Sequence, residues 1–300
     1  MSIKHRLIKL ILKFYRLFSA LLGRKFDINL ISSRALQRNF YKVNCDRIQS
    51  TLQQKKIIFF DVGARGGLDS GLNKYRDILD IYVSEPDPEA FIKIESKGYT
   101  AVKSLIGRDN GSAVLNICKA GGLSSVLPPS GKFSDLFARG DVSVFDIVKT
   151  IKLKTETISS IFNNSRDGLD LLKMDVQGFE NNVIDGLVDV RPLIIETEIS
   201  FVPLYKDSAI FFELGKKLYD MGYILFHLSY HSRNSYGKYL TNETNFKNRM
   251  PVSGDAWFMP DWTRKEGVDI IKGREHQWSA LMLMFGMEDI LNYARDKIKT

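Results

Sequence analysis

The sequence predicts an α/β fold with a mostly parallel sheet, an antiparallel last strand and helices on both faces. Three observations support this prediction. Residues 57–62 (IIFFDV) form a continuous apolar run that ends in Asp and then glycines, as a strand buried on both faces does. Strand-like and helix-like segments then alternate, which is typical of a parallel sheet covered by helices. The chain has 300 residues and is 44% hydrophobic, enough for one large domain.

The segments follow one another in a regular order. We expect strands at 57–62, 81–85, 99–105, 112–118, 169–174, 193–197, 223–228 and 256–259, the last antiparallel. We expect helices at 72–79, 89–97, 179–187, 209–221 and 276–298. The turn signal Asp109-Asn110-Gly111 predicts that 112–118 forms a hairpin with the strand before it.

These segments divide the chain into four parts. Residues 1–25 form a basic amphipathic helix, 26–55 a helical lead-in, 56–260 the α/β domain and 261–300 a helical tail. Within the domain, residues 119–150 read as irregular and are long for a plain connection, which favours a lid or substrate loop.

The charge of the chain is concentrated at its start. The formal net charge is +8, but seven basic residues precede Asp27 and leave 36 basic against 35 acidic residues in the rest. A nucleic-acid groove needs basic residues across the folded body, so we expect no nucleic-acid partner. Cys45 and Cys118 are far apart, which argues against a disulfide and favours a cytoplasmic location.

Residues 3–22 place apolar side chains at spacings of three and four, with Lys9, Lys13 and Arg16 on the opposite side. Charges interrupt every apolar run long enough to cross a membrane, and no signal-peptide pattern is present. Two interpretations stay open. The helix lies in the membrane interface at the inner face of the membrane, or it packs on the body or forms a homodimer.

The turn at 61–67 and the acid after the second strand form a candidate cofactor site. Ligands bind outside the carboxyl ends of parallel strands, where glycines such as Gly63 and Gly67 let the backbone approach them. Glu85 follows Asp61 by 24 residues and can accept hydrogen bonds from both hydroxyls of a ribose. The pair fits an adenosine-containing cofactor without choosing between NAD and S-adenosylmethionine.

Residues 171–186 (LLKMDVQGFENNVIDG) resemble the FkbM-type methyltransferase family, in which this strand usually reads K-I-D-V-E-G-x-E before a helix that ends in glycine. The turn resembles the family's D-V-G-A-N-x-G, with Arg65 in place of Asn, and Gln177 replaces the common Glu. Ser84-Glu85-Pro86, GLSSV at 122–126 and IIETEISFVPLY at 194–205 are also similar to the family, so the resemblance covers about residues 57–230. The matched positions of the strand and helix are Lys173, Asp175, Val176, Gly178, Glu180 and Gly186.

This resemblance implies a Rossmann-like class I methyltransferase sheet and transfer of a methyl group from S-adenosylmethionine. The acceptor would be a hydroxyl on a sugar, glycan or related natural product. By the same resemblance, the methionine end of the cofactor would lie on the turn of Asp61, Gly63, Ala64 and Gly67. The ribose would lie on Glu85 and Pro86, the adenine near Ser104 and Leu105, and the sulfonium and acceptor beside Asp175.

No residue is uniquely marked as the general base that O-methylation needs. The catalytic candidates are Asp175, Glu196 and His231. We also weigh Glu198, and we expect it and Glu196 to point to opposite faces, so that at most one faces the pocket. Asp175, Glu196 and His231 could together hold a divalent metal, but no metal-ligand spacing supports one, and we predict no metal.

Two other functions stay open. An NAD-dependent oxidoreductase or epimerase would share the glycine turn, but Arg65 occupies the place of the second glycine in G-x-G-x-x-G. The other alternative is a non-catalytic scaffold of methyltransferase fold that its basic helix recruits to a membrane. Gln177 and Arg65 favour this alternative because they depart from the family's pattern. The aromatic and polar stretch 229–249 suits stacking on a sugar, or is an ordinary surface loop.

Overall fold

The computed structural model describes residues 45–65, 67, 70–95, 97–131, 141–163, 168–233 and 250–298. The fold described below is that of the compact unit Ile48–Thr300. The expected amphipathic helix at 3–22, most of the lead-in 26–55 and residues 234–249 of the expected aromatic stretch lie outside the described residues. None of the helices in the described ranges is long and apolar enough to cross a membrane.

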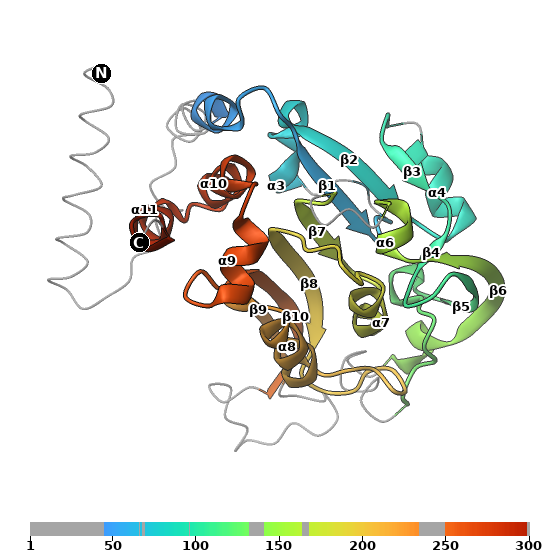
Figure 1. The fold of residues 1–300 in the computed structure, drawn as a ribbon. Coiled ribbons are helices and arrows are strands. Elements are labelled where there is room, and N and C mark those ends of the chain that lie inside the picture. The colour runs from blue at the N-terminus through green and yellow to red at the C-terminus, as the bar shows by residue number, and fades with distance from the viewer. Residues whose placement is uncertain are drawn as a thin grey trace, which may run out of the picture. The chain divides into compact units, whose positions relative to one another are not determined.

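The centre of the unit is a seven-stranded sheet in the order β3-β2-β1-β7-β8-β10-β9, with helices gathered around it (Figure 1). The strands are β1 (Ile57–Val62), β2 (Leu79–Ser84), β3 (Thr100–Val102), β7 (Leu171–Met174), β8 (Ile194–Ser200), β9 (Tyr223–Arg233) and β10 (Met250–Pro260). All pairs from β3 to β8 are parallel, and β10 runs antiparallel between β8 and β9. This confirms the predicted sheet. The strand order reverses between β1 and β7, the place where ligands bind in such sheets.

The helices follow the strands along the chain. They are α3 (Ser70–Asn73), α4 (Pro88–Glu95), α6 (Ile158–Ile161), α7 (Glu180–Asp185), α8 (Phe211–Asp220), α9 (Lys265–Ile271), α10 (Glu275–Met284) and α11 (Glu288–Ile298), with short 3-10 turns η2 (Arg76–Ile78), η3 (Gly121–Leu123) and η4 (Val142–Phe145). The apolar runs of the central strands form the core: Phe59, Phe60, Leu171 and Ile194 are completely buried. Neighbouring residues of β1 are buried on both faces, which explains its continuous apolar sequence.

A second sheet of three strands, in the order β4-β6-β5, corrects two expectations. The strand expected at 99–105 is divided between the sheets, since Thr100–Val102 is β3 of the large one and β4 (Leu105–Ile106) belongs to the small one. The expected hairpin is also wrong. β5 (Gly111–Cys118) pairs antiparallel with β6 (Ile147–Glu156), whose first residues lie in the stretch expected to be irregular. The Ser84 hydroxyl donates a hydrogen bond to the Ser104 carbonyl (2.9 Å), which holds the chain in place where it leaves the large sheet.

The C-terminal helices pack against the start of β7. Arg274 is buried and donates to the carbonyls of Leu169 and Ile270, both at 3.0 Å. The single helix expected at 276–298 is two helices, α10 and α11. The helical conformation is interrupted between them at Gly286, which has a φ of +73°, a backbone conformation that commonly ends a helix.

Candidate active site

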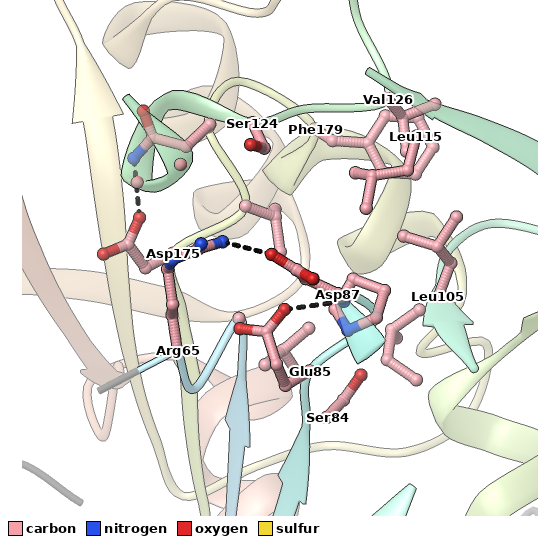
Figure 2. Close-up of a pocket in the computed structure, with 18 residues that line it drawn as sticks. Arg65, Ser84, Glu85, Asp87, Leu105, Leu115, Ser124, Val126, Asp175 and Phe179 are labelled. Carbon is pink, nitrogen blue, oxygen red and sulfur yellow. Dashed lines mark hydrogen bonds and ion pairs between the residues drawn. The ribbon is translucent and has the colours of Figure 1, made fainter. Parts of the chain in front are cut away.

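An open pocket lies at the carboxyl ends of β1, β2 and β7, facing the small sheet and η3 (Figure 2). It measures about 700 Å³ when the open space at its mouth is counted. Its lining comprises Val62, Gly63, Arg65, Ser84, Glu85, Pro86, Asp87, Leu105, Ile106, Leu115, Gly121, Gly122, Ser124, Val126, Asp175, Val176, Gln177 and Phe179. The pocket therefore forms where the strand order reverses.

The glycine turn after β1 brings the ends of three strands together. Gly63 has a φ of +88°, and a Cβ built there would lie 2.9 Å from the carbonyl carbon of Asp175 and closer still to its oxygen. The N–H groups of Gly63 and Ala64 both donate to the carbonyl of Ser84, at 2.9 and 3.0 Å. Gly67, at a φ of +75°, donates to the carbonyl of Ala64. Only a residue without Cβ fits between β1 and the end of β7.

Glu85 follows β2 directly and is 5% exposed, although it lines the pocket. Its Oε1 accepts a hydrogen bond from the Asp87 N–H at 2.8 Å. Burial raises the pKa of Glu85 to about 7, against the opposing effects of that hydrogen bond and of the Arg65 charge. Hydrogen bonds donated by the hydroxyl groups of a ligand would favour the ionised carboxylate and lower the pKa of Glu85 again.

Arg65, at the departure from the family's Asn, crosses the pocket and pairs with Asp87, Nη1 to Oδ2, at 2.9 Å. The other oxygen of Asp87 accepts the Glu89 N–H at 3.1 Å, at the start of α4. Figure 2 shows the Arg65 side chain reaching over Glu85 towards Asp87. In the described part of the chain, the charged side chains that line the pocket are this one arginine and the carboxylates of Glu85, Asp87 and Asp175.

A row of charges crosses the sheet beneath the pocket. Asp61, Lys173 and Glu196 are register partners on β1, β7 and β8. Lys173 Nζ lies 3.3 Å from Asp61 Oδ1. Burial acts to lower the pKa of Lys173, but the carboxylates of Asp61, Glu196 and Asp175 have the larger combined effect, so the pKa is raised above its usual value. Burial raises the pKa of Glu196 to about 7, opposed by the Lys173 charge and a hydrogen bond with Trp257 of β10.

A second cluster of acids lies one step further along the strands. The Gln177 amide nitrogen donates to Asp175 Oδ1 at 2.8 Å and to Glu198 Oε2 at 2.6 Å. Burial, and then the charges of Asp175 and Glu180, hold the pKa of Glu198 well above its usual range. The expectation that Glu196 and Glu198 face opposite sides is wrong. Side chains alternate along a strand, so residues two apart share a face.

Gln177 itself is held firmly in place. It has a φ of +55°, and its side-chain oxygen lies 2.9 Å from the Tyr205 hydroxyl, whose single proton is shared between this oxygen and the Leu123 carbonyl at 3.0 Å. The Ser125 hydroxyl donates to the Gln177 carbonyl at 2.7 Å. The second serine of the GLSSV segment therefore fastens the η3 loop to the turn after β7, while Ser124 lines the pocket.

The other motif residues shape the same turn. The Glu180 carboxylate accepts from the N–H groups of Val176 and Gly178 at 3.0 and 3.3 Å. Burial raises the pKa of Glu180 to about 7, against these hydrogen bonds. Gly186 ends α7, where a Cβ would lie 3.1 Å from the carbonyl carbon of Gly107. These positions build the backbone around Asp175.

The structure brings most of the expected site residues together. Those that line the pocket are Gly63, Glu85, Pro86, Leu105 and Asp175. Five others lie beside it. Asp61 and Glu196 belong to the charge row, and Ala64 and Gly67 to the glycine turn. The hydroxyl of Ser104 donates a hydrogen bond to Glu156. His231 belongs to β9, where it pairs with Ser253, but its side chain lies outside the described residues. Among the described residues, no cluster of His, Cys, Asp and Glu is arranged to hold a metal.

Sequence reasoning missed the apolar side of the pocket, formed by Leu115, Val126 and Phe179. Leu115 is buried between half-buried or exposed neighbours on β5, so the alternation of that strand contained the signal. Lys173 was recognised as a motif position but not as the partner of Asp61 and Glu196. That pairing depends on how three strands are aligned with one another, and this alignment cannot be read from a single sequence.

The chain matches the family described as Methyltransferase FkbM domain over residues 61–225, more than half its length. No curated protein sequence matches it. The solved structures that are similar to this chain include two methyltransferases. A magnesium protoporphyrin IX methyltransferase from Synechocystis PCC 6803, with bound SAM, has 9% identity and a TM-score of 0.36 over 79% of this chain and 86% of that one. A precorrin-6y C5,15-methyltransferase from Geobacter metallireducens GS-15 has 12% identity and a TM-score of 0.28 over 72% and 86%. Neither likeness bears on what this chain binds.

Proposed function

Because the chain belongs to the FkbM methyltransferase family, we propose that it binds S-adenosylmethionine in the pocket and methylates a hydroxyl oxygen of a sugar, glycan or related natural product. The observation that carries this proposal is the buried carboxylate of Glu85 at the end of β2, beside the glycine turn of β1. A carboxylate in this place can accept hydrogen bonds from both hydroxyls of the cofactor's ribose.

The charges of the pocket support a sulfonium cofactor over a dinucleotide. S-adenosylmethionine carries a sulfonium and an ammonium against one carboxylate, so it is a net cation. NAD carries a negatively charged pyrophosphate. Glu85, Asp87 and Asp175 outnumber Arg65 among the lining residues, so the pocket attracts the first ligand and repels the second.

The proposed reaction needs a proton acceptor near the methyl group. The acceptor oxygen attacks the methyl carbon, the carbon–sulfur bond breaks, and its electron pair stays on sulfur to give S-adenosylhomocysteine. The hydroxyl proton passes to the carboxylate of Asp175, which lines the pocket and which Gln177 joins to Glu198 through one amide nitrogen. Because Tyr205 and Ser125 hold Gln177, the pair stays in position for an in-line transfer.

Isothermal titration calorimetry with S-adenosylmethionine tests the cofactor. We expect the wild type to bind and Glu85→Gln to weaken binding by about tenfold or more, the cost of losing hydrogen bonds to a charged group. Asp80→Asn is the matched control, because Asp80 is an exposed acid on the same strand, paired with Lys56. A wild type that does not bind the cofactor would refute the proposal and favour the scaffold.

Transfer of labelled methyl from S-adenosylmethionine to a panel of mono- and oligosaccharides tests the acceptor. We expect a methyl ether, identified by NMR of the product, and a loss of turnover without loss of cofactor binding in Glu198→Gln. Label recovered on nitrogen or carbon instead of oxygen would contradict O-methylation.

A further inference from the structure

Arg65 is the one cation among the described residues that line the pocket, and its place there favours a ligand with a group of opposite charge. S-adenosylmethionine has two positive groups and a single negative one, the carboxylate of its methionine part. An arginine that faced the sulfonium or the ammonium would oppose binding, since charges in a partly enclosed pocket are weakly screened. Only the carboxylate complements it.

The arginine is positioned by its surroundings. Its guanidinium lies against Gly121 of η3, where an added Cβ would come 2.7 Å from Arg65 Cζ, so the missing side chain of Gly121 provides the space. Asp87 holds it from the other side at 2.9 Å. The side chain is 40% exposed through the mouth of the pocket and stays within reach of a ligand.

Asp87 keeps another hydrogen bond when it releases the arginine. Its Oδ1 accepts the Glu89 N–H at the start of α4, and this bond does not depend on Arg65. The Arg65 side chain is 40% exposed and the Asp87 side chain 10% exposed, so solvent screens the pair in part. A ligand carboxylate offers the same charge together with the two-pronged geometry that a guanidinium matches best.

We propose that Arg65 binds the carboxylate of the cofactor's methionine part, exchanging its bond to Asp87 for one to the ligand. This inference rests on the proposed cofactor. Arg65, which replaces the family's Asn, would then determine cofactor affinity. The assignment also explains how a pocket rich in carboxylates binds the carboxylate end of a cofactor that is positively charged overall.

Calorimetry of the full chain with two ligands tests the assignment: S-adenosylmethionine and its decarboxylated analogue, which keeps both positive groups. We expect Arg65→Gln to weaken the first ligand by about 10- to 100-fold, the worth of a charge-assisted hydrogen bond. The second ligand should bind at least as well without the arginine as with it. Arg65→Lys, which keeps the charge but loses the fork, should fall between. Arg108→Gln is the matched control, because Arg108 is an exposed arginine paired with Asp185, outside the pocket lining.

The outcomes separate the two proposals. A selective loss of S-adenosylmethionine binding in Arg65→Gln supports the assignment. Equal loss of both ligands, or no loss of the first, overturns it while the proposed function stands. A wild type that binds neither ligand overturns both.

Discussion

Replacing Gly63 by alanine tests whether the contact between β1 and the end of β7 forms the pocket. The position has a φ of +88°, a backbone conformation that side chains with a Cβ rarely adopt, and the added Cβ would meet the backbone of Asp175 at 2.9 Å or less. A backbone carbonyl cannot turn away as the end of a side chain can. The strands must therefore separate, and Asp175 must move with them.

The expected cost has two parts. Strained backbone costs about 1–3 kcal/mol, and forcing a methyl group into packed structure costs about 1–3 kcal/mol. Together these give a loss of about 2–6 kcal/mol in the free energy of unfolding. For a unit of this size, about 2–4 °C per kcal/mol predicts a melting temperature lower by at least about 4 °C.

Gly122→Ala is the matched control for this substitution. Gly122 also lines the pocket, but its φ is not positive, and a Cβ there would meet no atom within 4 Å. Thermal unfolding followed by circular dichroism, with calorimetry of S-adenosylmethionine binding, measures both variants. We expect Gly63→Ala to lose stability and cofactor affinity and Gly122→Ala to keep its stability. Equal melting temperatures for the two variants would refute the reasoning.

Further predictions concern two buried charged groups and the hydroxyl of Tyr205. Lys173→Met should lower the free energy of unfolding by about 3 kcal/mol in urea, because Asp61 and Glu196 lose their shared cation; a loss no larger than that of Lys173→Arg would contradict this. Since Glu85 is buried with a pKa of about 7 against an ordinary 4.5, its contribution to the stability of the unliganded protein is complete below about pH 4.5 and disappears as pH rises through about 7. For the same reason S-adenosylmethionine affinity should fall about tenfold per unit below pH 7, a dependence that calorimetry should find absent in Glu85→Gln. Tyr205→Phe should cost about 1 kcal/mol in urea unfolding by releasing Gln177 and the Leu123 carbonyl; no change would show that these bonds do not hold the turn.

The large sheet could be predicted because its signals are local. The run at 57–62 coincides with β1, since complete burial leaves an uninterrupted apolar sequence. The small sheet could not be predicted in the same way. Six of the ten residues of β6 are exposed, among them Lys149, Lys152 and Lys154. Its partner β5 lies some 30 residues earlier in the chain, so the pairing has no local signal.

The candidate site was predicted where a motif places a residue at a strand end, as for Glu85 and Asp175. It was not predicted where two residues meet across strands. The pairing of Arg65 with Asp87 depends on the angle between the turn and α4, and the link between Asp175 and Glu198 depends on the rotamer of Gln177. Such distances follow from packing in three dimensions, which alternation along one strand does not reveal.

The row of Asp61, Lys173 and Glu196 also has a consequence for folding. Its members come from strands that leave the ribosome far apart in time, with Asp61 more than a hundred residues ahead of Lys173. A nascent chain that buried β1 early would bury the Asp61 carboxylate without the cation of Lys173, which is costly. The centre of the sheet is therefore expected to close only when β7 and β8 have arrived, so that β1, β7 and β8 are gained or lost as one cooperative unit.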